Sequence, residues 1–141
     1  MTKKYKILAK FIKDASSETA DIETFLFVKE NLSKYQLNID ITSKALKNKL
    51  VEVNTTLKFE DKEANEKKSY YEIVYTTIIS VDNDIKEKKD MEKIILCEVP
   101  TEIYPELEKS FLNLMHNSGH PDITLEKKID FEKLYNEKKR N

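Results

Sequence analysis

Four segments, residues 5–14, 35–41, 51–60 and 69–81, carry apolar residues at every second position along at least one face. This period places successive side chains on opposite faces of an extended chain, so each segment is predicted to form a β-strand. Residues 47–49 are predicted to form a turn, 61–68 a charged hairpin loop, and 15–34 a long connection. The alternation is clearest in the third segment, where one face carries Val51, Val53, Thr55, Leu57 and Phe59.

The fourth segment is apolar on both of its faces. Tyr70, Val74 and Ile78 lie opposite a face that carries Tyr71, Ile73, Tyr75, Ile79 and Val81. A strand of this kind is expected to be covered on both sides. The cover is supplied either by the connection at residues 15–34 or by a partner chain, and periodicity leaves both alternatives open.

Two helices are predicted after residue 97, while residues 82–93 form a solvated run of charge. Ile103, Leu107, Phe111 and Leu114 recur at helical spacing, with Pro105 in the first turn. Gly119 is expected to end this helix in the left-handed conformation, and a second helix begins after Asp130, a capping residue. Four strands followed by a long helix and a short C-terminal helix indicate the α+β class, with an antiparallel sheet.

Composition narrows the possible functions. The 141 residues are expected to form a single domain, 1–141, with a flexible tail over about 137–141. The 25 Lys and Arg residues nearly balance the 26 Asp and Glu residues, and the net charge of -1 argues against a nucleic-acid partner. No apolar run approaches a membrane span, and the N-terminus does not resemble a signal peptide. One cysteine fits a reducing, cytoplasmic location.

No arrangement of residues indicates an active site. With one glycine the chain has no glycine-rich phosphate loop. His116 and His120 have a spacing that is compatible with metal binding on a helix, but they are interpreted as solvated residues at a helix C-terminus. Cys97 is interpreted as a buried structural thiol. The sequence therefore predicts neither an enzyme nor a bound cofactor or metal.

Five segments, in order, resemble the SecB family of protein-export chaperones. FIKDASSE resembles the family pattern Y-x-K-D-[LI]-S-x-E, and VPTEIYP resembles P-x-x-[LI]-[FY]-P. The C-terminal GHPDITLEKKIDFEKLY resembles GFPPLxLxPIDFxxLY. The other two segments, LVEVNTTLKFE and YYEIVYTTIISV, resemble strands of the family.

The resemblance implies a chaperone that holds unfolded precursor proteins in apolar grooves and delivers them to the translocation ATPase SecA. It implies a homotetramer, a dimer of dimers with the long helices between two eight-stranded sheets. It also implies a SecA-binding patch of Asp14, Glu18, Tyr70 and Glu72. The implied groove residues are Tyr35, Leu37, Ile39, Tyr71, Ile73 and Tyr75.

Some positions depart from the family pattern. Thr76 and Thr77 replace a glycine pair, Glu106–Glu108 replace an aromatic-Ala-Arg segment, and the chain is near neutral with a basic end. Two other functions therefore remain open. One is a SecB-like chaperone dedicated to a single client such as an antitoxin, and the other is an oligomeric adaptor that binds no unfolded chain.

Overall fold

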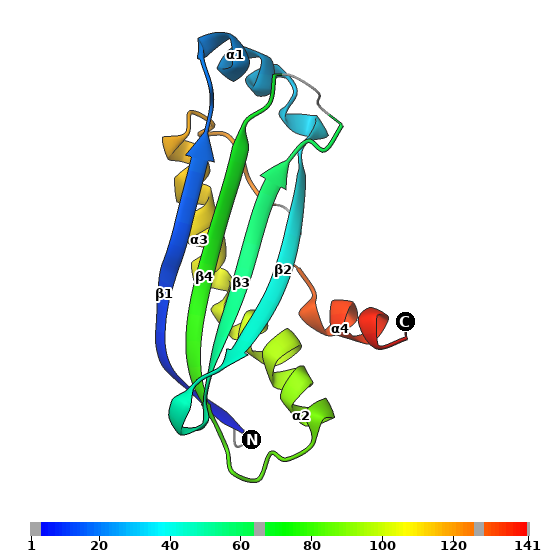
Figure 1. The fold of residues 1–141 in the computed structure, drawn as a ribbon. Coiled ribbons are helices and arrows are strands. Elements are labelled where there is room, and N and C mark those ends of the chain that lie inside the picture. The colour runs from blue at the N-terminus through cyan, green and yellow to red at the C-terminus, as the bar shows by residue number, and fades with distance from the viewer. Residues whose placement is uncertain (1–3, 64–66, 126–128, 141) are drawn as a thin grey trace.

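The structure, a computed structural model, describes residues 4–63, 67–125 and 129–140. Its four strands form one antiparallel sheet, as the sequence predicts, and the structure gives the strand order as β1-β4-β3-β2 (Figure 1). The strands are β1 (Tyr5–Glu18), β2 (Gln36–Ala45), β3 (Leu50–Glu60) and β4 (Tyr70–Val81). The helices are α1 (Ile22–Glu30), α2 (Lys88–Lys93), α3 (Val99–Asn117) and α4 (Phe131–Arg140), with short turns η1 (Leu32–Lys34), η2 (Lys47–Lys49) and η3 (Ile94–Glu98).

The long helix α3 lies against one face of the sheet, which we call the inner face (Figure 1). On β4 this face carries Tyr71, Ile73, Tyr75 and Ile79, and all four side chains are buried. Ile103, Leu107, Phe111 and Met115 of α3 are buried against them in the core. The opposite, outer face carries Tyr70, Val74 and Ile78, which are only half-buried. Of the two alternatives for covering this face, the connection at residues 15–34 does not supply the cover, because the helices of the chain lie on the other side of the sheet. Cover by a partner chain stays a prediction.

The charged segment 82–93 contains the short helix α2, which the sequence did not predict. Helix α2 continues through the π-helical turn η3 into α3, so that Pro105 lies inside the helix and not in its first turn. Pro100, in the first turn of α3, follows the wider turn of η3, where the N–H that proline lacks is not needed for a regular helical ladder. The ribbon changes direction between α2 and α3 (Figure 1).

The connection at residues 15–34 is more regular than the sequence indicates. Strand β1 continues through Glu18 because Ser16 and Ser17 pair with β4 despite their polar side chains. Helix α1 then begins at Asp21, whose Oδ1 accepts a hydrogen bond from the Thr24 amide at 2.8 Å. Val28 joins the core, but α1 caps the end of the sheet and leaves the outer face open (Figure 1).

The C-terminal helix begins where the sequence predicts. Asp130 Oδ1 accepts a hydrogen bond from the Lys133 amide at 3.1 Å, and Phe131 is buried against Tyr104 with ring centroids 5.6 Å apart. Helix α4 continues through Arg140, over most of the segment that was expected to be a flexible tail. Cys97 is buried, as predicted.

The end of α3 fixes the position of α1. Gly119 has φ +97, which confirms the predicted left-handed ending. A side chain there would collide with the ring of Phe25, which stacks on His120 with centroids 5.4 Å apart. His120 is only 3% exposed, so its interpretation as a solvated residue is wrong, whereas His116 is exposed. Burial, with a smaller effect of Lys29, lowers the pKa of His120.

We expect protonation of His120 to destabilise the fold. In an unfolded chain the pKa of histidine is about 6.5, and in the folded chain the pKa of His120 is lower. As the pH falls, the unfolded state therefore binds the proton first. The free energy of unfolding should decrease below about pH 7, by at most about 1.4 kcal/mol per pH unit, and should level off below the lowered pKa. Urea unfolding of the unchanged chain and of His120→Phe, measured across this range, checks the expectation.

The variant His116→Phe is the matched control, because it removes an exposed histidine. In this control the free energy of unfolding should depend on pH as it does in the unchanged chain. In His120→Phe the contribution of residue 120 to that pH dependence should be lost. Equal slopes for His120→Phe and the unchanged chain would contradict the assignment.

Candidate functional site

The six predicted groove residues all belong to the inner side of the sheet, on the two strands that β3 separates and directly before one of them. Leu37 and Ile39 lie on β2, and Tyr71, Ile73 and Tyr75 lie on β4. Tyr35 immediately precedes β2 and is only 8% exposed. The register aligns Leu37 of β2 with Phe59 of β3, and Phe59 with Tyr71 of β4. It likewise aligns Ile39, Leu57 and Ile73. Tyr35 and Tyr71 still approach each other, with ring centroids 6.4 Å apart. The sequence placed Phe59 and Leu57 on an apolar face but could not show that they lie between the predicted residues.

The two strands differ in how far they are covered. Tyr71, Ile73 and Tyr75 of β4 are 0%, 1% and 6% exposed beneath the helices. On β2, by contrast, Leu37 and Ile39 are only half-buried, because β2 is an edge strand that α3 does not reach as closely. The accessible part of the predicted groove is therefore its β2 side.

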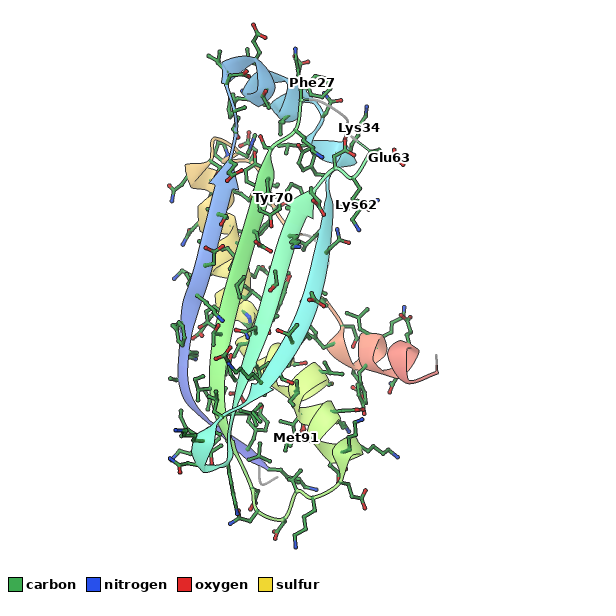
Figure 2. The ribbon with its side chains drawn as sticks, in the orientation of Figure 1. Phe27, Lys34, Lys62, Glu63, Tyr70 and Met91 are labelled. Atoms are coloured by element: carbon green, nitrogen blue, oxygen red, sulfur yellow. The ribbon has the colours of Figure 1, made fainter. Side chains whose placement is uncertain are left out.

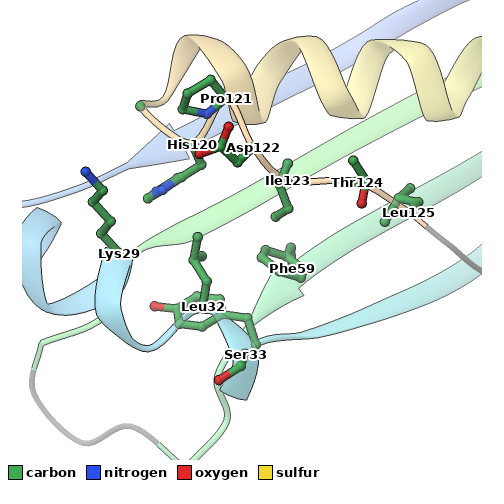
Figure 3. Close-up of a pocket in the computed structure, with 12 residues that line it drawn as sticks. Lys29, Leu32, Ser33, Phe59, His120, Pro121, Asp122, Ile123, Thr124 and Leu125 are labelled. Carbon is green, nitrogen blue, oxygen red and sulfur yellow. The ribbon is translucent and has the colours of Figure 1, made fainter.

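A hollow of about 510 Å³, which we call the link hollow, lies between α1, the sheet and the segment that follows α3. Figure 3 shows its lining, with Phe59 on the sheet and Ile123 and Leu125 on the segment that crosses over it. Leu32 and Tyr35 complete its apolar part. Lys29 and His120 lie together at the end toward α1 (Figure 3).

A second hollow of about 240 Å³, which we call the β2–α4 hollow, lies further along the same edge strand. Leu134 of α4 borders it and is 43% exposed. Its side chains are mostly apolar, so β2 has one apolar recess beside its beginning and another beside its middle. The lining residues are Ile39, Asp40, Ile41, Leu96, Phe131, Leu134 and Tyr135.

The tyrosine hydroxyls beneath these hollows have hydrogen-bond partners. The Ser69 amide donates to the Tyr35 hydroxyl at 3.0 Å, and the Tyr71 hydroxyl lies 2.9 Å from His120 Nε2. Tyr75 donates to Glu106 Oε2 at 2.7 Å, and burial followed by this carboxylate raises its pKa to about 12. Because Lys10 binds the other Glu106 oxygen at 2.8 Å, this position ties β1, β4 and α3 together.

The four residues of the predicted SecA patch meet on the outer face, near one end of β1 and β4. Glu18 of β1 is paired with Tyr70 of β4, and Ser16 of β1 is paired with Glu72 of β4. Asp14 lies two residues before Ser16 on β1 and is therefore diagonal to Glu72. Figure 2 shows Tyr70 on this face. Partial burial, a hydrogen bond with Glu72 and nearby carboxylates raise the pKa of Tyr70 to about 12. Lys58 offsets part of this negative charge, since its Nζ lies 3.7 Å from Glu72.

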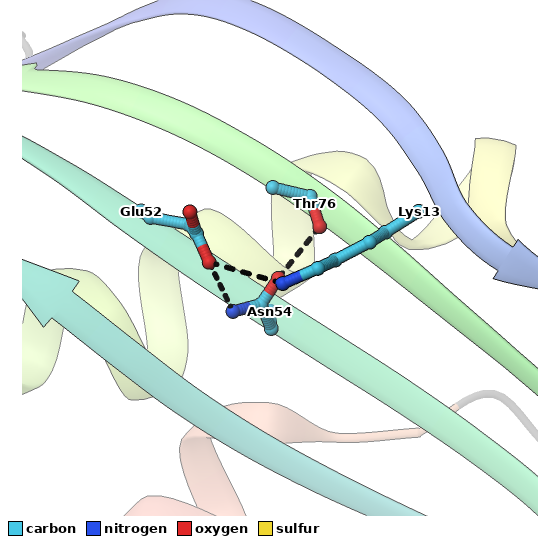
Figure 4. A network of polar contacts seen from close by, with 4 residues as sticks. All are labelled: Lys13, Glu52, Asn54 and Thr76. Carbon is cyan, nitrogen blue, oxygen red and sulfur yellow. Dashed lines mark hydrogen bonds and ion pairs between the residues drawn. The ribbon is translucent and has the colours of Figure 1, made fainter.

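A polar network crosses the middle of the outer face (Figure 4). Thr76 Oγ1 donates to Asn54 Oδ1 at 2.6 Å, and Asn54 Nδ2 donates to Glu52 Oε2 at 2.8 Å. Lys13 also reaches Glu52, at 3.5 Å. The hydrogen bond from Asn54, together with the Lys13 charge, holds the pKa of Glu52 below its ordinary value. Thr76 therefore joins β4 to β3, and the Lys13–Glu52 contact extends the network to β1.

Two kinds of feature are missing from the part of the chain that the structure describes. Over residues 4–63, 67–125 and 129–140, no three His, Cys, Asp or Glu side chains gather closely enough to hold a metal ion. No helix in those ranges is both long enough and apolar enough to cross a membrane.

Comparison with known proteins supports the resemblance seen in the sequence. The family model described as preprotein translocase subunit SecB matches residues 1–141. A provisionally named protein-export protein SecB of Pelagibacter ubique is 56% identical over 138 residues, which cover 98% of this chain and 99% of the relative. The protein-export protein SecB of Mesorhizobium japonicum is 24% identical, with 94% and 77% covered.

A solved structure has a similar fold. It is the Mycobacterium tuberculosis Rv1957 SecB-like chaperone in complex with a ChAD peptide from the Rv1956 HigA1 antitoxin. The TM-score is 0.61 at 10% identity, with 89% of this chain and 91% of that chain covered. Because the family model matches the whole chain and the Pelagibacter relative is similar over nearly all of it, the chain belongs to the SecB family of protein-export chaperones.

Proposed function

We propose that this protein is a cytoplasmic chaperone that binds unfolded precursor proteins along the β2 side of the sheet. The observation that supports this most directly is the pair of half-buried apolar residues on β2: Leu37, next to the link hollow, and Ile39, which lines the β2–α4 hollow. In this proposal Tyr35, Leu37 and Ile39 contact the client. Tyr71, Ile73 and Tyr75 form the buried floor that holds those side chains in place.

Such a surface suits clients of many sequences. Apolar contact contributes roughly 25 cal/mol per Å² of buried surface without requiring particular hydrogen-bond partners. The aromatic floor offers broad contact to branched and aromatic side chains alike. The free edge of β2 also offers main-chain hydrogen bonds to an extended segment.

We further propose that the client is delivered to SecA and that the outer-face patch is the docking surface. Asp14, Glu18, Tyr70 and Glu72 lie close together and away from both hollows. A client held at β2 would therefore leave the patch free. Carboxylates of this kind speed the encounter with a basic partner more than they add affinity.

Self-assembly is supported by the other edge of the sheet. Among the residues that the structure describes, no strand pairs with the outer side of β1, where Leu8, Phe11 and Ile12 are 50%, 48% and 47% exposed. Exposed apolar side chains on a free edge are a template for pairing with a second strand. Pairing of two β1 strands would give the eight-stranded sheet of a dimer, and two dimers would form the tetramer.

The main test is the prevention of aggregation by the purified protein. Several unrelated unfolded proteins should remain in solution in its presence. Protection of a single client would favour the dedicated chaperone, and an oligomer that protects none would favour the adaptor.

The first variant removes apolar surface from β2. Ile39→Ser should weaken the binding of an unfolded precursor about tenfold, because the side chain loses roughly 1.5 kcal/mol of apolar contact. Calorimetric titration with a denatured precursor measures the change. Ile22→Ser is the control, since Ile22 is 73% exposed on α1 and lines neither hollow. Equal losses in both variants would count against a site on β2.

A charge reversal tests the docking patch. Asp14→Lys with Glu72→Lys should weaken SecA binding about tenfold at low salt, and the difference should shrink as ionic strength rises. Asp84→Lys with Glu87→Lys changes the net charge equally in the exposed loop before α2 and should have little effect. If the two pairs lose affinity alike, the patch is not the docking surface.

Oligomeric state tests the β1 edge. Phe11→Asp with Ile12→Asp places charges on the free edge strand, and sedimentation should show smaller particles than the tetramer expected of the unchanged chain. Circular dichroism should remain that of a folded α+β chain, because both side chains are half exposed. A tetramer that persists in the variant would refute assembly through β1.

A further inference from the structure

His120 introduces a polar group into the otherwise apolar wall of the link hollow. His120 stands between Gly119 and Pro121. Its imidazole ring is flat, as a phenylalanine ring is, but it carries two nitrogen atoms that can take part in hydrogen bonds.

The ring of His120 is held firmly by its neighbours. Phe25 stacks on it with an interplanar angle of 21°, and Tyr71 meets it edge to face at 88°. Nε2 is occupied by the Tyr71 hydroxyl at 2.9 Å. Nδ1, in contrast, is buried and has no hydrogen-bond partner among the described residues. A buried polar atom left in this state is costly to the fold.

The surroundings define what can satisfy Nδ1. Leu32, Phe59, Ile123 and Leu125 line the rest of the hollow and favour a flat apolar body (Figure 3). The Lys29 ammonium on α1 disfavours a second cation at this end. A carboxylate can only accept hydrogen bonds, and its charge would be expensive to bury in an apolar recess.

We propose that His120 makes the link hollow select a tyrosine side chain of the client over a phenylalanine, with the phenol hydroxyl bonded to Nδ1. This deepens the proposed function, on which it rests. A phenol hydroxyl both donates and accepts, so it pairs with Nδ1 in either tautomer of the neutral imidazole. Phenylalanine fills the same space but leaves Nδ1 unpaired. His120 is thus a specificity-determining residue within an otherwise permissive surface.

The test uses two unstructured, leucine-containing peptides that differ only in one central residue, tyrosine or phenylalanine. Calorimetry at neutral pH measures the binding of each to the full-length protein. The unchanged chain should bind the tyrosine peptide about tenfold more tightly, the factor expected for one satisfied buried hydrogen bond. In His120→Phe the preference should vanish or reverse while the phenylalanine peptide still binds.

The variant His116→Phe makes the same chemical change at an exposed position of α3, outside the link hollow. It should keep the tenfold preference. Equal binding of the two peptides by the unchanged chain, or a preference that survives His120→Phe, would overturn the inference while the chaperone function stands. If neither peptide nor any denatured precursor binds, the proposed function fails and the inference falls with it.

Discussion

One helix cannot cover the whole inner face of a four-stranded sheet, and the rest of the structure depends on this mismatch. Helix α3 packs over β4 and β3, where Leu57, Tyr71 and Ile73 are buried. Strand β2 lies beyond its reach, so the apolar face of β2 is shared between α4, the segment after α3 and solvent. Apolar area that stays in contact with water favours association with any chain that can cover it.

The positions that depart from the family pattern fasten the sheet with polar contacts. Glu106 links Lys10 of β1 to Tyr75 of β4 from above the inner face. Thr76 begins a network through Asn54 and Glu52 on the outer face. Both sets of contacts join neighbouring elements through side-chain hydrogen bonds. Neither set of contacts covers the outer edge of β1 or of β2.

Much of the fold could be predicted from local pattern alone. The strands follow from apolar residues at every second position, which is clearest in β3. The end of α3 follows from Gly119 and the start of α4 from Asp130, whose effects are local. Helix α1 was missed because its capping residue, Asp21, precedes a segment with no clear apolar stripe, and its position depends on Phe25 meeting Gly119 far along the chain. The burial of His120 and the placement of Phe59 between β2 and β4 likewise arise only from tertiary packing and strand register.

The central claim is that unfolded polypeptides bind where α3 leaves β2 uncovered. Amide hydrogen exchange, read by mass spectrometry with and without a denatured precursor, tests this claim most directly. We expect slower exchange in residues 35–41 and 119–125, with little change in the amides of β4, which the sheet already protects. Protection confined to α2 or the outer-face patch, with no change along β2, would contradict the account.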